Sequence, residues 1–107
     1  MKDAKKLSEE LSYKKKTVYE AKDEAHINAA YDFSRGYAAF LDAAKTEREA
    51  VKTSVALAEK EGFKSYSFGD KLERGGKYYY DNRGKNLFLF TIGSEPLSEG
   101  VRISAAH

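Results

Sequence analysis

The chain has 107 residues, of which 41% are hydrophobic and 34% charged, and its formal net charge is +2. This length suffices for one small domain, and the near balance of charge gives no drive toward nucleic acid or acidic membranes. Cysteine is absent, which excludes disulfides and thiolate metal sites and fits a reducing cytoplasm, the compartment we expect. No signal peptide or membrane span is expected, since no stretch approaches the roughly 20 apolar residues that a membrane helix needs.

Residues 1–22 are predicted to form a polar N-terminal arm, because they are rich in lysine and contain few apolar anchors. A short helical turn is expected near Ser8 to Leu11. The lysines of "YKKKTVYEAKDE" could contact nucleic acid or act in targeting, but the glutamates nearby favour a solvated surface.

Residues 23–107 are predicted to contain two or three helices and then three or four strands. Asp23 suits the N-cap of the first helix, and apolar residues then recur at steps of three and four as far as Leu41. Gly36 interrupts this stripe and predicts a kink or a break into two helices. His26 has no companion ligand at helical spacing, so we interpret it as a surface or cap residue.

The second helix is the clearest in the sequence. Thr46 and Glu49 match the S/T-x-x-E capping box, in which two backbone N–H groups are satisfied reciprocally. Gly62 suits the left-handed position that ends a helix, and Phe63 can fold back onto the last turn. We therefore assign "AKTERE" a packing role and no catalytic one.

After the second helix, from residue 63 on, the side-chain pattern changes to the period of two that is typical of β-strands. Residues 63–68 are predicted to be a strand, and "KYYYD" and "NLFLFTIG" flank "NRGK", whose Asn82 and Gly84 suit a tight hairpin. The consecutive Tyr78 to Tyr80, near Lys77 and Arg83, could form a nucleic-acid platform. Sheet packing is favoured instead, because successive side chains of a strand point to opposite faces. "RGGK" lacks the spacing of a phosphate-binding loop.

The strand at residues 86–92 is apolar on both faces, which predicts a central strand of a sheet that is covered on both sides. Residues 101–105 are predicted to be the last strand, with His107 just beyond its end. Two helices can cover only one face, so we expect an α/β fold in which these residues are the first part of a larger domain.

Four blocks of the sequence together resemble one protein family: "FSRGYAAFLDAAKTEREAV", "AEKEGF", "YYYDNRGKNLFLFTIG" and "EGVRISAAH". In this order and spacing they resemble the start of the aspartyl aminopeptidase and aminopeptidase I family of zinc exopeptidases. The resemblance runs from about Tyr13 to His107. It implies a large α/β catalytic domain with an inserted β-rich domain, and assembly of the subunits into a large tetrahedral homo-oligomer, expected to be a dodecamer.

The resemblance also implies a role for His107. In the family, the matching histidine opens an H-x-D motif and binds one of two zinc ions. These ions activate water to remove N-terminal residues from peptides, and the resemblance favours acidic residues. The Asp of that motif and the other ligands would lie beyond His107, so no catalytic residue and only one metal ligand, His107, is expected here. Residues 1–107 alone are expected to be inactive.

A second class of function remains open from the residues alone. The chain could be a free-standing small α+β module that binds protein or nucleic acid. The aminopeptidase interpretation, with peptide substrates and with no nucleic-acid or membrane partner, is the one that the resemblance favours.

Overall fold

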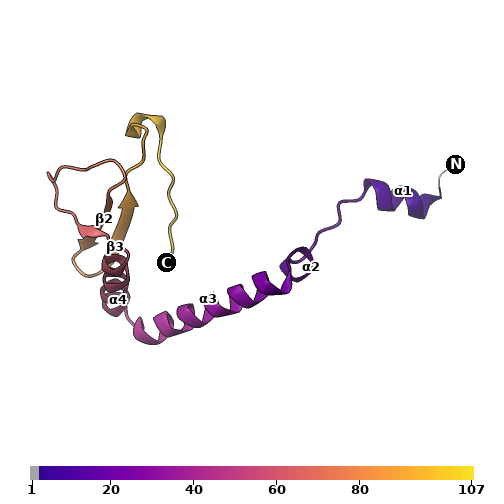
Figure 1. The fold of residues 1–107 in the computed structure, drawn as a ribbon, viewed down its shortest axis with the longest axis horizontal. Coiled ribbons are helices and arrows are strands. Elements are labelled where there is room, and N and C mark those ends of the chain that lie inside the picture. Colours follow the sequence, from indigo (N-terminus) through magenta and orange to yellow (C-terminus); the bar gives the residue numbers. More distant parts are fainter. Residues whose placement is uncertain (1–2) are drawn as a thin grey trace. The chain divides into compact units, whose positions relative to one another are not determined.

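A computed structural model describes residues 3–107, which form helices followed by a small sheet (Figure 1). Contacts within the chain divide it into two units, one up to Ala38 and one from Ala39 to His107. The first unit holds two short helices and most of a long one. The second holds the end of the long helix, a further helix and the sheet. No helix of residues 3–107 is long and apolar enough to cross a membrane.

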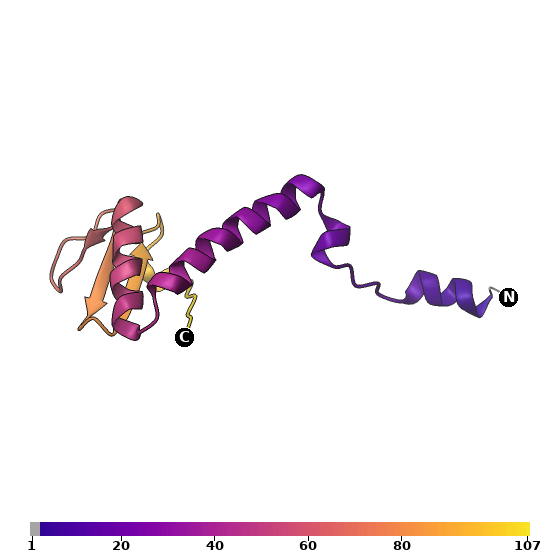
Figure 2. The same ribbon diagram turned by 90° about the horizontal axis from the view of Figure 1, so that it is seen from below.

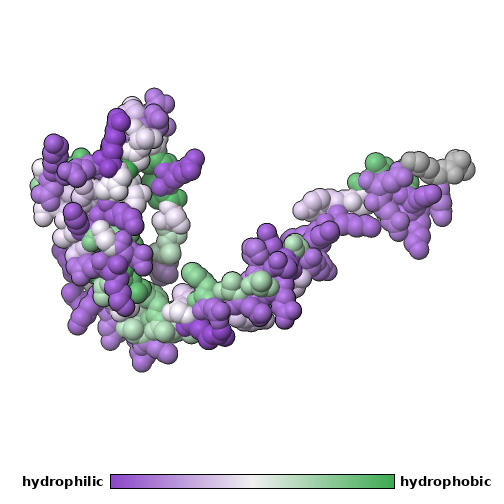
Figure 3. All heavy atoms as spheres, viewed as in Figure 1, coloured by the Kyte–Doolittle hydropathy of each residue, from purple (hydrophilic) through white to green (hydrophobic). Residues whose placement is uncertain are grey.

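The first unit begins with α1 (Ala4–Leu11) and α2 (Val18–Ala21), which bury no side chain. α1 is longer than the turn predicted near Ser8 to Leu11, and α2 was not predicted. Each begins at a capping residue: Asp3 accepts a hydrogen bond from the Lys5 N–H, and Thr17 forms a capping box with Glu20. Figure 3 shows mainly hydrophilic residues over these two helices.

The long helix α3 (Glu24–Ala43) is continuous, so the predicted kink or break at Gly36 is wrong. A glycine in a helix interior costs only about 1 kcal/mol relative to alanine, and the uninterrupted backbone hydrogen bonds on both sides outweigh that cost. The predicted cap is confirmed, because the His26 N–H donates to the Asp23 carboxylate at 2.9 Å.

Helix α4 (Glu47–Lys60) begins as predicted. The Glu49 N–H donates to the Thr46 hydroxyl at 3.2 Å, and the Thr46 N–H donates to the Glu49 carboxylate at 2.9 Å. Arg48 reaches the carbonyl of Arg83 in the hairpin turn, at 3.5 Å. The "AKTERE" block therefore starts the helix and ties it to the sheet, which is the packing role predicted for it.

The end of α4 is also as predicted. Gly62 has φ +84°, the left-handed conformation that glycine adopts without a steric penalty. Its N–H donates to the Glu59 carbonyl and the Phe63 N–H donates to the Ala58 carbonyl, both at 3.0 Å. These two bonds are the Schellman arrangement, and they turn the chain back toward the sheet.

The sheet has three strands in the order β1-β2-β3: β1 (Lys64–Ser65), β2 (Lys77–Asn82) and β3 (Asn86–Thr91). β1 is parallel to β2, and β2 is antiparallel to β3. The predicted hairpin is confirmed. Arg83 and Gly84 have φ +59° and +68°, and the Lys85 N–H donates to the Asn82 carbonyl, as in a type I′ turn.

Three strand predictions need correction. β1 covers only two of the residues in the stretch 63–68. β3 is an edge strand and β2 is the central one, so the predicted central position of residues 86–92 is wrong for this sheet. Residues 101–105 form no strand, because within the described chain they pair with no other strand; a 3₁₀ turn, η1 (Leu97–Glu99), precedes them.

The core of the second unit lies between α4 and one face of the sheet, and Figure 2 shows α4 lying across the strands. The only buried hydrophobic side chains of the described residues are Val51 and Ala58 of α4 and Tyr79 of β2. Tyr79 is the central residue of this contact, since it lies on the middle strand beneath the helix.

We expect Thr46→Ala to lower the free energy of unfolding by about 1 kcal/mol, because two helix N–H groups lose their reciprocal partners. Urea unfolding would measure the change. Lys52→Ala, at an exposed position of the same helix, is the matched control and should change stability little. Equal stability of the Thr46 and Lys52 variants would show that the capping box contributes nothing.

Candidate functional site

His107, the predicted metal ligand, lies in the exposed segment 101–107, which has no regular secondary structure. Val101 and Ile103 of the same segment are 64% and 84% exposed. The predicted strand that would place the imidazole at a sheet edge is therefore not formed, and the position of the ring is set by no neighbouring element of the described chain.

The residues that the structure describes contain no group of three or more His, Cys, Asp or Glu side chains that could hold a metal ion. His26, the other histidine, lies at the start of α3, and its Nδ1 is 3.2 Å from Asp23 Oδ1. This contact agrees with the predicted surface or cap role. Zinc sites in proteins use three or four protein ligands, so residues 3–107 do not by themselves form one, and His107 supplies a single imidazole.

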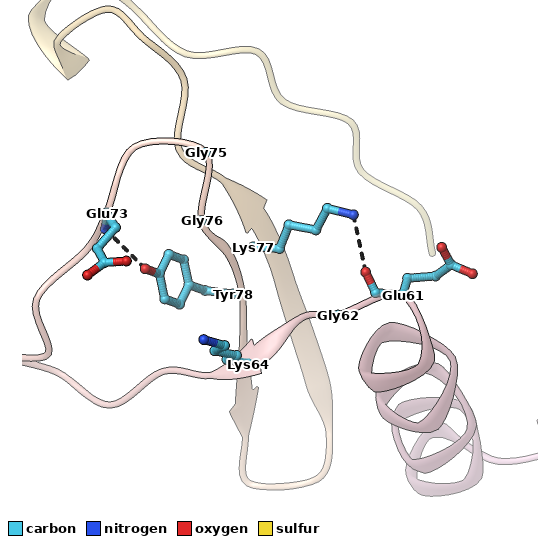
Figure 4. Close-up of a pocket in the computed structure, with 8 residues that line it drawn as sticks. All are labelled: Glu61, Gly62, Lys64, Glu73, Gly75, Gly76, Lys77 and Tyr78. Carbon is cyan, nitrogen blue, oxygen red and sulfur yellow. Dashed lines mark hydrogen bonds between the residues drawn. The ribbon is translucent and has the colours of Figure 1, made fainter.

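A pocket of about 310 Å³ lies where β2 meets the end of α4 and the loop before β2 (Figure 4). Lys77 and Tyr78 point to opposite sides of the strand. The Lys77 ammonium donates to the Glu61 carbonyl at 3.1 Å and lies 5.6 Å from the centre of the Phe63 ring. The lysine thus caps the carboxyl end of α4, where a cation is favourable.

The "RGGK" loop, which contributes Gly75 and Gly76 to the lining of this pocket, has a structural role. The Gly75 N–H donates to the Ile92 carbonyl and the Gly76 N–H to the Glu73 carbonyl, so neither amide is available to a phosphate. A Cβ at Gly76 would lie 2.5 Å from the Tyr78 ring, so a larger residue there would have to displace that ring. The Tyr78 hydroxyl in turn accepts the Glu73 N–H at 3.0 Å.

Tyr79 makes the one part-buried side-chain hydrogen bond recorded among residues 3–107. Its hydroxyl donates to Glu59 Oε1 of α4 at 2.8 Å. This hydrogen bond, with burial as a second cause, raises the pKa of Tyr79 above its ordinary value. The phenol is therefore held in its protonated form, as a link between helix and sheet and not as a base.

The opposite face of the sheet gathers aromatic rings that the sequence interpretation did not bring together. In the register of the hairpin, Tyr78 pairs with Phe90 and Tyr80 with Phe88, so all four rings share one face. Tyr66 and Phe68, which follow β1, join them. This grouping could have been predicted from the sequence. The hairpin turn sets the register of the two strands, and the register decides which aromatic side chains lie opposite each other.

The comparisons with known proteins identify the family. Residues 40–107, almost two thirds of the chain, match the family described as Aminopeptidase I zinc metalloprotease (M18). The chain belongs to this family. The resemblance noted from its sequence blocks is thereby confirmed, and the family is one of aminopeptidases whose description names zinc.

Similar proteins named "Probable M18 family aminopeptidase 1" occur in several bacteria. The chain is 34% identical to the protein of Clostridium acetobutylicum over 96 residues. This matched segment is 86% of the present chain and 21% of the Clostridium protein. The chain is 30% identical over 94 residues to the protein of Borreliella afzelii (88% and 20%) and 31% identical over 99 residues to that of Thermotoga neapolitana (91% and 21%). The chain thus spans about a fifth of the length of these relatives. No solved structure gives a significant match.

We expect Tyr79→Phe to lower the free energy of unfolding by about 1 kcal/mol at neutral pH, through loss of the bond to Glu59. The folded-state pKa is raised, so this contribution is fully present below the unfolded pKa of about 10 and is lost as the pH rises through the folded pKa. Urea unfolding at a series of pH values would measure it.

Tyr80→Phe is the matched control, because the Tyr80 hydroxyl makes no hydrogen bond recorded within residues 3–107. If the two variants lost equal stability at every pH, the Tyr79–Glu59 bond would not link the helix to the sheet.

Proposed function

We propose that the chain is the first part of the catalytic domain of a zinc-dependent aminopeptidase, which removes N-terminal residues from peptides. The observation that carries this proposal is the family match, which extends over almost the whole second unit and includes residue 107 itself. The helix α4 and the hairpin of β2 and β3 lie within the matched residues, so the structured part of the unit is the part that the family shares.

Within this proposal, His107 binds one of two zinc ions. Its ring is exposed, and no hydrogen bond of the ring to another described residue is recorded, so its nitrogens remain available to a metal. A neutral imidazole is a normal zinc ligand. The remaining ligands and the groups that handle protons during hydrolysis come from elsewhere in a full-length protein, because residues 3–107 contain no group of three or more side chains that could hold a metal ion.

The finer points of the proposal follow the family resemblance. The substrates are peptides, with acidic N-terminal residues preferred. The subunits assemble into a large homo-oligomer, a dodecamer with tetrahedral symmetry. The proposed cytoplasmic location rests instead on the lack of cysteine in the sequence. The arm of residues 1–22 and the catalytic part that begins at residue 23 are separate segments in this scheme.

In the full-length protein, we expect His107→Ala to remove about one zinc ion per subunit and to abolish turnover, because each catalytic zinc depends on a complete set of protein ligands. Elemental analysis and hydrolysis of aminoacyl chromogenic substrates would measure both. His26→Ala is the matched control, since His26 is exposed and contacts only the capping Asp23 among the described residues, and it should leave both quantities unchanged. Unchanged metal content and turnover in the His107 variant would overturn the assignment.

We also expect residues 1–107 on their own to show no aminopeptidase turnover in the presence of zinc, since one imidazole cannot hold a two-metal site. The same chromogenic substrates test this with the purified 107-residue chain, and the full-length protein serves as the positive control. Hydrolysis by the short chain that survives further purification would contradict the proposal.

A further inference from the structure

The N-terminal arm carries the positive charge of the chain. Residues 1–22 hold seven of the 19 lysine and arginine residues and four of the 17 aspartate and glutamate residues, which gives them a net charge of +3. Residues 23–107 have a net charge of −1. The near balance over the whole chain therefore conceals a basic arm beside a slightly acidic remainder. The charge is concentrated in residues 13–22, which contain four lysines and one glutamate and which we call the basic segment.

The lysines of the basic segment are not neutralised within the described chain. Lys14, Lys15 and Lys16 are exposed, and no ion pair or hydrogen bond of their side chains is recorded among residues 3–107. Glu20, the one glutamate of the segment, accepts the Thr17 N–H at 3.0 Å and so belongs to the capping box of α2. The nearby glutamate thus serves the backbone and does not balance the lysines, and the segment favours an anionic partner.

Apolar side chains lie along the chain on both sides of these lysines. Those with large exposed fractions are Leu7, Leu11, Tyr13, Val18 and Tyr19. Leu7 and Leu11 share one face of α1 with Ala4, and the helix buries no side chain. An isolated helix of this length is marginal in water, so a partner that takes up the leucine face would also stabilise α1.

The mixture of side chains favours a lipid surface over nucleic acid. Bases stack on aromatic rings, whereas Leu7, Leu11 and Val18 are aliphatic and would stay in water on a nucleic acid. At the surface of a bilayer, aliphatic side chains enter the acyl boundary, tyrosine rings lie at the headgroup level and lysines contact anionic headgroups. A bilayer accepts these groups without a groove of matching shape, so both short helices and the irregular residues between them can lie along it together.

We propose that residues 3–22 bind the surface of a bilayer that contains anionic lipids. Lys14, Lys15 and Lys16 contact the headgroups, and the exposed apolar side chains of the arm enter the acyl boundary. Each lysine near such a surface strengthens binding about fivefold, so the attachment is reversible and weakens as salt screens the charges. The inference goes beyond the proposed function and does not rest on it, because it concerns the arm alone.

The test is co-sedimentation of the full-length protein with vesicles made of equal parts of phosphatidylcholine and phosphatidylglycerol. We expect the protein to bind these vesicles and not vesicles of phosphatidylcholine alone, and the binding to weaken as salt is added. The combined variant Lys14→Gln, Lys15→Gln and Lys16→Gln should bind about 100-fold more weakly, because three attractive charges are lost.

The matched control removes three lysines from the second unit. Lys52→Gln, Lys60→Gln and Lys71→Gln, combined in one chain, change the net charge by the same amount at exposed positions outside the arm. This control should bind the mixed vesicles as the unchanged protein does.

A further variant tests the apolar contact. Leu7→Ser combined with Leu11→Ser keeps every charge of the arm and removes two side chains from the acyl boundary. We expect it to bind the mixed vesicles about tenfold more weakly than the unchanged protein.

Three results would overturn the proposal. The first is no binding to the mixed vesicles, or equal binding by the arm variant and the control that each lose three lysines. The second is full binding by the leucine variant, which would remove the apolar contact. The third is binding of single-stranded RNA in place of the vesicles, which would assign the basic segment to nucleic acid.

Discussion

The contact between α4 and the hairpin of β2 and β3 is the interaction on which the second unit depends. It contains the buried hydrophobic side chains Val51, Ala58 and Tyr79, and it is tied at its centre by the bond from Tyr79 to Glu59. The two ends of the helix are fastened separately, by Arg48 to the hairpin turn and by Lys77 to the carbonyl of Glu61. With so few buried groups, the packing at this contact carries a large share of a marginal stability.

The features that could be predicted from the sequence are those decided within a few residues along the chain. The capping box at Thr46, the glycine end at Gly62 and the turn at Gly84 each depend on backbone groups three to five positions apart. Gly36 was misjudged although it is local, because its small penalty is spread over twenty helical residues that favour continuation.

The predictions that failed concern features that depend on residues far away in the sequence. Residues 101–105 have the alternation of a strand, but a strand exists only where another strand accepts and donates its backbone hydrogen bonds. The position of β3 in the sheet is likewise a property of its neighbours and not of its own side chains. For the same reason the role of His107 as a ligand stays a prediction from the family resemblance, since the described residues do not assemble a metal site around it.

The exposed rings on the sheet face opposite α4 (Phe68 and Phe88), the free edge of β3 and the unpaired segment before His107 have one physical explanation within the proposed function. In that proposal, a larger sheet would add a layer over the rings, a strand beside β3 and pairing for the segment before His107. A metal ligand beyond the end of a strand is held only as firmly as that strand, and the strand only as firmly as its pairing. Completion of the sheet would then order residues 101–105, fix the imidazole of His107 and cover the rings in a single cooperative step. Zinc affinity would be coupled to folding of the whole domain, because the ligands converge only once the sheet is complete.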